Sequence, residues 1–414
     1  MIFFTLLVGI MPLSDHHFWG AEIAGLTMFK WIGLSCIAYA GFYLTRRSGP
    51  PNFLQTWQAR LFIVFYGLAL TSYLVKRLAA GAGAQAVQSY TSFLLLFFIT
   101  LAVVDSARRL CWTLLTAVGA VAFASLYVIR EWQVYHNLYS GFRPGAVVGD
   151  PNYFSVSAVL CIPIALCLMK PLRKAWQRAF LLGSIFLITV AMVLAASRGG
   201  FLGLVAATLL LLYRSRKRWR NLALVAALAP VILFLPLAPI QRLVHPNYSD
   251  REAQDARLVA WRAGLRMLSA HPLAGVGLGN FKASMIAYRD RDDTIVSIAH
   301  NTYLEVAAET GIPALLLFLV LIGVSCASLE RSRRRAIRLR GELLSQMALG
   351  MEAGVLGFAV SIFFLSAEYQ KLFWLILLLS MCMPPLLDRR ASLLRQKMSQ
   401  ARPEAKPQGV LQPA

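Results

Sequence analysis

The stretch HNTYLEVAAETGIPALLLFLVLIGV, from His300 to Val324, joins a polar cluster to an apolar run. Its first part holds a histidine, an asparagine, a tyrosine and two glutamates, whereas the part from Ile312 onward has no polar side chain. A span over residues 303–325 is long enough to cross the hydrocarbon core of a bilayer as one helix. The sequence therefore predicts a membrane-spanning helix that carries titratable groups at its N-terminal end.

The whole chain has the apolar character of that run. Of its 414 residues, 58% are hydrophobic and only 14% are charged, and the mean hydropathy is +0.61. Soluble domains have about 45–50% apolar and about 25% charged residues. We therefore expect an all-α polytopic membrane protein of about twelve spanning helices. Apolar stretches predict them near 1–13, 22–45, 57–75, 86–104, 110–129, 152–169, 178–196, 200–213, 221–237, 303–325, 343–366 and 371–387.

Basic residues favour one orientation of these helices. The net charge is +22, and 26 of the 41 Lys and Arg residues lie on one side of the twelve-span arrangement, in runs such as RSRKRWR and ERSRRRAIRLR. The positive-inside rule then predicts that both termini are cytoplasmic. Because the basic runs border membrane spans, we expect no nucleic-acid partner. The first span lacks the features of a signal peptide, so we expect it to be retained.

This orientation divides the chain into four parts. Residues 1–237 hold spans one to nine, 238–302 form a large outer loop, 303–388 hold spans ten to twelve, and 389–414 form a cytoplasmic basic tail. The six cysteines fall within predicted spans or, for Cys326, directly after one, and none forms a CxxC pair, so no disulfide framework is expected. The outer loop keeps eight basic residues, which an anionic ligand would explain.

The outer loop contains a predicted amphipathic helix within SDREAQDARLVAWRAGLRMLSA. Leu258, Trp261, Leu265 and Leu268 share one face, so this helix should lie on the membrane surface, its stripe in lipid or on the bundle. Arg257 lies at one edge of the stripe. The following HPLAGVGLGNF resembles a dinucleotide fingerprint only superficially, because no strand precedes it. A tight turn that packs against a helix is the better interpretation.

Three further motifs place polar groups at the outer ends of helices. ASRGG puts Arg198 between two predicted spans, where its charge must be paired, hydrated or bound to an anion. In VVGDPNYFS, Asp150 is well placed as a helix N-cap with Pro151 in the first turn. His300 is the natural proton acceptor near neutral pH. Asn301, Glu305 and Glu309 are four residues apart and share one stripe.

Taken in order, GDPNYFS, ASRGG, DARLVAWRAG, HPLAGVGLGNF and HNTYLEVAAETGIPALLLF resemble the motifs of the O-antigen ligase and polymerase superfamily, over roughly residues 149–312. The resemblance implies a GT-C-type, inverting glycosyltransferase without metal or other cofactor, its active site on the periplasmic face of the bacterial inner membrane. A ligase would transfer a glycan from undecaprenyl pyrophosphate to a sugar hydroxyl of lipid A–core. His300 would be catalytic, and Arg198 and Arg257 would bind the donor pyrophosphate.

Possible supporting residues of such a site are Asp150, Asn152, Arg262, Asn301, Tyr303, Glu305 and Glu309. Membrane lipids are further expected partners, and the sequence leaves the glycan and the oligomeric state open. Within the same superfamily, a polysaccharide polymerase or a protein O-oligosaccharyltransferase stays an alternative. A transporter of the lipid-linked glycan is an alternative of another class, although transporters usually carry internal repeats. The acidic residues of RDRDD, from Arg289 to Asp293, could instead bind Mg²⁺ or Ca²⁺.

Overall fold

The structure is a computed structural model that describes residues 1–14, 22–23, 26–45, 53–75, 80–138, 142–145, 150–215, 248–290 and 292–400. Within these residues the regular secondary structure is helical except for one short antiparallel pair, β1 (Glu22–Ile23) and β2 (Leu26–Thr27). The predicted all-α class is thus confirmed. The predicted span 221–237, the first residues of the predicted outer loop and the end of the basic tail lie outside the described residues.

The described helices follow the predicted spans closely. They are α1 (Ile2–Ile10), the 3-10 helix η1 (Met11–Leu13), α2 (Met28–Thr45), α3 (Trp57–Val75), α4 (Ala80–Val103), α5 (Ala107–Tyr135), α6 (Pro151–Leu168), α7 (Ala175–Ala195), α8 (Arg198–Tyr213), α11 (Tyr248–Ala270), α12 (Phe281–Tyr288), α13 (Thr302–Arg338), α14 (Glu342–Ser361) and α15 (Lys371–Gln400).

Eight of the described helices, α3 to α7 and α13 to α15, are long and apolar enough to span a bilayer. Large apolar side chains such as Phe186, Val64 and Leu316 are exposed on their outer surfaces, as lipid-facing residues would be. The chain is therefore a multi-pass membrane protein. The shorter apolar helices α1 with η1 and α8, together with the less apolar α2, occupy three more of the predicted spans, and the count of twelve stays a prediction.

Three predicted spans need correction. The span expected over 371–387 belongs to a helix, α15, that continues to Gln400 into the predicted basic tail. The span expected from residue 22 begins as a helix only at Met28, because residues 22–27 include the β1–β2 pair. The span expected over 303–325 belongs to a helix that continues to Arg338 and is broken at Gly311, where the backbone is not helical. Arginine is a good helix former in water. The basic run after the apolar segment therefore extends α13 beyond the predicted span.

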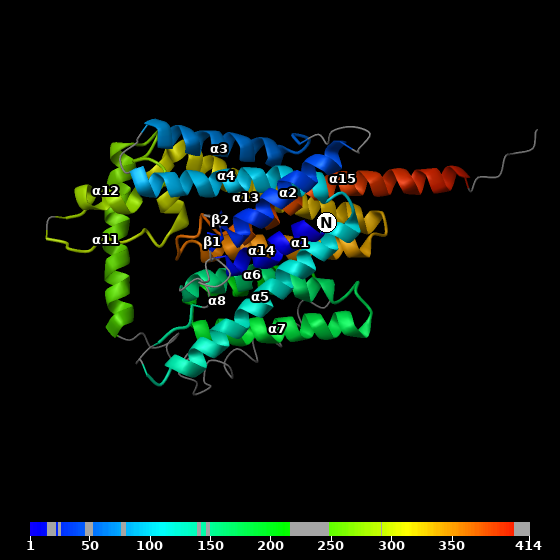
Figure 1. The fold of residues 1–414 in the computed structure, drawn as a ribbon, viewed down its shortest axis with the longest axis horizontal. Helices are drawn as coiled ribbons and strands as arrows, with labels where there is room; N and C mark the ends of the chain where they lie inside the picture. The colour runs from blue at the N-terminus through cyan, green and yellow to red at the C-terminus, as the bar shows by residue number, and fades with distance from the viewer. Residues whose placement is uncertain are drawn as a thin grey trace, which may run out of the picture.

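Helix α11 runs across one end of the bundle, roughly perpendicular to α3, α4 and α13 (Figure 1). This arrangement fits the predicted surface helix, because an axis across the bundle lies in the plane of the membrane. Its contact face was not predicted. Ala260, Ala263 and Met267 are buried against α12 and α13, whereas Leu258 and Leu265 are exposed. Of the two predicted placements, Leu265 takes the one that points away from the bundle, whereas the exposed Leu258 also lines a cavity between α11 and the bundle.

The centre of the bundle is aromatic and surrounds Trp374 near the start of α15. Trp374 is fully buried, and its ring lies 5.4–5.8 Å from those of Phe62, Phe65 and Phe93 on α3 and α4. Such packing of large rings contributes both buried apolar area and favourable ring geometry. It fixes the start of α15 against α3 and α4, next to the segment that connects α14 to α15.

Candidate active site

A cavity of about 500 Å³ lies where α6, the α7–α8 corner, α11 and the end of α14 meet. Its polar lining is dominated by Arg143, Arg198 and Arg257, together with the amides of Asn152 and Gln254. No acidic side chain is among the described residues that line it. Three guanidinium groups around one cavity create a positive potential and offer planar sets of donors, the arrangement that proteins use to bind phosphate and carboxylate.

Arg198 is held at this cavity by a tight corner between two helices. Ala196 ends α7 in the left-handed conformation, with φ 47°. The Ser197 hydroxyl then caps α8 by accepting from the backbone N–H of Gly200 at 3.3 Å, so Arg198 is the first residue of α8. Glycine is required farther along, because a Cβ at Gly203 would overlap Ser361 of α14. This close packing keeps the N-terminus of α8 against α14.

Arg143 is a member of the cavity that the motifs did not predict. Its Nε donates to the carbonyl oxygen of Ala195 at 3.0 Å, and its Nη2 donates to Oδ1 of Asn152 at 3.0 Å. Asp150 caps α6 as predicted, since its Oδ1 accepts from the Asn152 backbone N–H at 2.7 Å. In the sequence, Arg143 is a single arginine before a Pro-Gly pair, in the loop between two predicted spans. Such a pattern is too weak to assign a role to the arginine.

Arg257 reaches the cavity from α11, which is anchored one turn later. The indole Nε1 of Trp261 donates to the carbonyl oxygen of Ala299 at 2.8 Å, and the same ring meets Phe363 edge-on, with centroids 5.9 Å apart. Trp261 also lines the cavity. Arg262, by contrast, is exposed and is not among the residues that line it.

His300 lies next to this cavity in a conformation that its neighbours enforce. Its φ is 48°, a left-handed value that costs a residue other than glycine about 1–3 kcal/mol. Ala299 before it is bound by Trp261. Thr302 after it donates its backbone N–H to the Leu365 carbonyl oxygen at 3.0 Å and its Oγ1 to the same oxygen at 2.8 Å. Trp261 and Leu365 both line the cavity, so the histidine is fixed from both sides at its edge.

The electrostatic surroundings of His300 favour its neutral form. Burial lowers the pKa of the imidazole below its ordinary value, the positive charge of Arg257 lowers it further, and the negative charge of Asp150 opposes them. A neutral imidazole at neutral pH can accept a proton. The structure thus brings a histidine that can accept a proton next to a cavity lined by three arginines.

The other polar residues of the histidine motif mainly hold the structure together. Asn301 caps α13 by accepting from the Leu304 backbone N–H at 3.0 Å, and the Tyr303 hydroxyl donates to the carbonyl oxygen of Ala359 on α14 at 2.6 Å. Glu305 is buried and accepts a hydrogen bond from the hydroxyl of Ser366. These contacts fasten the start of α13 to α14 and to the segment that follows it.

Glu309 fixes the glycine-rich turn to α13. Its carboxylate accepts from the backbone N–H groups of Gly279 at 2.8 Å and Phe281 at 3.0 Å, and its carbonyl oxygen accepts from Gly277 at 3.0 Å. At Gly275, where φ is 66°, a Cβ would overlap the backbone of Glu309. The prediction of a tight turn packed against a helix is therefore confirmed, and the role of Glu309 is to hold it.

The acidic segment after α12 forms an ion pair with α11. Asp290 pairs with Arg266 at 2.7 Å on the surface of the outer region. Within the described part of the chain, no group of three or more His, Cys, Asp or Glu side chains is arranged to hold a metal ion.

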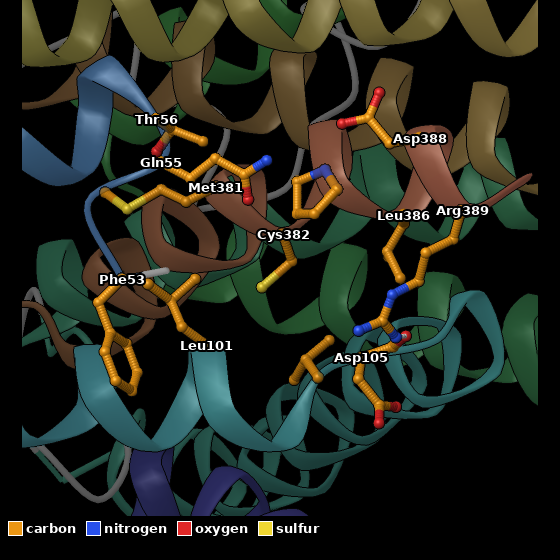
Figure 2. Close-up of a pocket in the computed structure, with 12 residues that line it drawn as sticks. Phe53, Gln55, Thr56, Leu101, Asp105, Met381, Cys382, Leu386, Asp388 and Arg389 are labelled. Carbon is orange, nitrogen blue, oxygen red and sulfur yellow. Dashed lines mark hydrogen bonds between the residues drawn. The ribbon is translucent and has the colours of Figure 1, made fainter. Parts of the chain in front are cut away.

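A second cavity, of about 280 Å³, is lined by residues of α4, α15 and the segment before α3 (Figure 2). Figure 2 shows Asp105 after α4 close to Arg389 on α15, and Arg389 donates to the Asp105 carbonyl oxygen at 2.6 Å. Phe53 and Thr56, which line this cavity, precede the first residue of α3, whereas Ser72 near the other end of α3 binds the glycine-rich turn. This cavity is therefore separate from the arginine site.

Comparison with known proteins supports the resemblance that the motifs predicted. Residues 183–319 match the model of a family described as O-antigen ligase. This segment contains Arg198, Arg257 and His300, whereas Arg143 and Asn152 precede it. No curated protein sequence matches the chain significantly. The match is consistent with the O-antigen ligase and polymerase superfamily and with a glycosyltransferase-like membrane enzyme.

Proposed function

We propose that this protein is an O-antigen ligase, which transfers a glycan from undecaprenyl pyrophosphate to a sugar hydroxyl of lipid A–core. The observation that carries the proposal is the cavity where Arg143, Arg198 and Arg257 meet beside His300. A positively charged cavity next to a half-buried imidazole, whose pKa is lowered by burial and by Arg257, suits a reaction in which an anionic group leaves and a hydroxyl is deprotonated.

The arginines would bind the donor pyrophosphate. Guanidinium forks pair with phosphate oxygens through two parallel hydrogen bonds, and they keep their charge at any physiological pH. As the bond between the glycan and the pyrophosphate breaks, negative charge grows on the leaving oxygen. Fixed positive groups in a cavity lined by Trp261, Phe364 and Leu365 stabilise that charge more strongly than water would. Because the arginines would stabilise the charge of the leaving group, we propose transfer without a metal ion.

His300 would act on the acceptor. The acceptor oxygen attacks the anomeric carbon from the face opposite the pyrophosphate. A new glycosidic bond forms as the bond between the anomeric carbon and the pyrophosphate oxygen breaks. The electron pair of that bond leaves with the pyrophosphate, and the hydroxyl proton passes to the imidazole of His300. A single displacement of this kind inverts the anomeric configuration.

The place of the cavity suits substrates that are anchored in lipid. Residues of α11 line it, and α11 crosses one end of the bundle (Figure 1), so a head group could enter it while the hydrocarbon chain stays in the bilayer. The distribution of basic residues supports a periplasmic position for this end, with both termini in the cytoplasm of a bacterial cell.

Reconstitution tests the proposal. The purified protein in liposomes receives undecaprenyl-pyrophosphate-linked glycan together with lipid A–core, or with a second lipid-linked glycan, each with and without EDTA. We expect product only on lipid A–core, with the anomeric configuration inverted and with no loss in EDTA. Elongation of the lipid-linked glycan would instead identify a polymerase, and loss of transfer in EDTA would refute the metal-independent mechanism.

A further inference from the structure

A groove of about 420 Å³ lies on another side of the bundle, between α1, α2, α4 and the first residue of α15. None of the residues that line it also lines the arginine cavity. The groove and the arginine cavity lie near the same end of the bundle. The segment 362–370 binds Thr302 of α13 and contributes Leu365 to the arginine cavity, and it leads directly into Lys371 at the groove. The groove is therefore a second site at the level of the proposed active site.

One end of the groove is basic and polar. Lys30 on α2 and Lys371 at the start of α15 line it, accompanied by hydroxyl and amide groups of Ser14, Thr27, Gln88, Ser89 and Ser92. The ammonium group of Lys371 donates to the hydroxyl of Ser14 and lies 5.1 Å from the centre of the Phe29 ring. No acidic side chain is among the described residues that line the groove. This end therefore complements an anion.

The rest of the groove is apolar and opens to the outside. Gly33, Leu34 and Ile37 follow Lys30 on one face of α2, and Leu95, Leu96 and Ile99 follow Ser92 on α4. Leu34, Ile37 and Leu95 are 49%, 38% and 42% exposed. From Lys30 to Ile37 the groove extends about 10 Å along α2. Along both helices the lining residues are first polar and then apolar. A lipid has the same order, with a polar head group followed by a hydrocarbon chain.

We propose that this groove binds an anionic phospholipid, with its phosphate at Lys30 and Lys371 and one acyl chain along Gly33, Leu34 and Ile37. Charge complementarity selects an anionic head group, since two lysines and no acidic residue are among the described residues that line this end of the groove. The exposed leucine and isoleucine side chains select a molecule with a hydrocarbon chain over a free anion. This site is distinct from the arginine cavity, so the inference does not depend on the proposed function.

Gly33 offers a way to close the groove without disturbing the protein. A Cβ at Gly33 meets no atom within 4 Å, so a larger side chain there would enter the groove instead of the core. Gly41, on the same helix but outside the groove, is equally open and provides the matched control. We therefore compare wild type with Gly33→Phe, Gly41→Phe and Lys30→Gln.

The experiment measures binding of phosphatidylglycerol to the detergent-purified full chain by native mass spectrometry, with phosphatidylcholine and inorganic phosphate as competitors. We expect a tight phosphatidylglycerol in wild type and Gly41→Phe, loss of it in Gly33→Phe, and about fivefold weaker binding in Lys30→Gln. Neither competitor should displace it. Equal binding in Gly33→Phe and wild type would overturn the proposal, and displacement by inorganic phosphate would show an anion site without a lipid.

Discussion

Trp261 on α11 donates a hydrogen bond to the carbonyl oxygen of Ala299, the residue before His300, across 2.8 Å. Arg257 precedes Trp261 by four residues on the same helix, so it lies one helical turn away. A single hydrogen bond thus links the helix that carries one proposed phosphate ligand to the segment that carries the proposed base. The separation between these two groups depends on how α11 is docked.

We expect Trp261→Phe to slow glycan transfer by about twofold to tenfold, because a hydrogen bond that contributes about 0.5–1.5 kcal/mol is lost. The phenyl ring keeps the contact with Phe363, so the protein should still fold. Turnover should fall more than donor affinity, since the left-handed conformation of His300 loses one of its supports. Reconstituted transfer assays and donor titrations measure the two effects.

The neighbouring substitution Arg262→Gln is the control for Trp261→Phe. Arg262 lies on the exposed side of α11, outside the cavity. Its replacement should change turnover by less than a factor of about two, as exposed substitutions usually do. Equal losses in the two variants would mean that the whole outer helix, and not the Trp261 hydrogen bond, controls the reaction.

The three arginines should differ in how they respond to substitution. Arg198→Ala and Arg257→Ala should each abolish transfer and donor binding, and lysine should restore little, because it lacks the planar fork. Arg143 also holds Asn152, so Arg143→Lys should weaken donor binding by at least about tenfold while the protein stays folded. Isothermal titration with the lipid-linked donor checks this. Wild-type affinity in Arg143→Lys would leave Arg143 a purely structural role.

The sequence predicted those parts of the site that depend on local chemistry. The Asp150 cap, the tight turn of Gly275 and the surface helix follow from short-range rules about caps, glycine and periodicity. The docking face of α11 was missed because alanines form it, and hydrophobic patterning follows the larger leucines. Arg143 could not be assigned, since its partners Ala195 and Asn152 come from other segments of the chain.

For Glu309, the sequence suggested a functional role, whereas the contacts of its carboxylate are structural. A glutamate at a membrane boundary suggested a functional role, yet its two oxygens accept from Gly279 and Phe281. We expect Glu309→Gln to destabilise the protein by about 1–3 kcal/mol, since the amide NH₂ group would face a backbone donor. Thermal unfolding in detergent measures the loss. The pH dependence of transfer in the remaining folded protein should match wild type, and a changed profile would give Glu309 a part in proton transfer.

His300→Ala should lower turnover by about two to four orders of magnitude, the usual contribution of a general base. Donor affinity should be largely retained, because the arginines and not the imidazole would hold the pyrophosphate. Single-turnover kinetics and donor titration separate these quantities. The control is His271→Ala, since His271 bonds the hydroxyl of Tyr288 in the outer region, away from the cavity lining. Loss of donor binding in His300→Ala would make the histidine a phosphate ligand.

The pH dependence of transfer offers the most specific test of the base. Burial and Arg257 lower the pKa of His300, so wild-type activity should persist below pH 6.5 and fall only as the imidazole becomes protonated. Asp150 acts in the opposite direction and raises that pKa. In Asp150→Asn the negative charge is gone, while asparagine still caps α6. The acidic limb of the pH–rate profile should therefore move to lower pH in this variant. A limb that stays in place, or moves to higher pH, would show that another group accepts the proton.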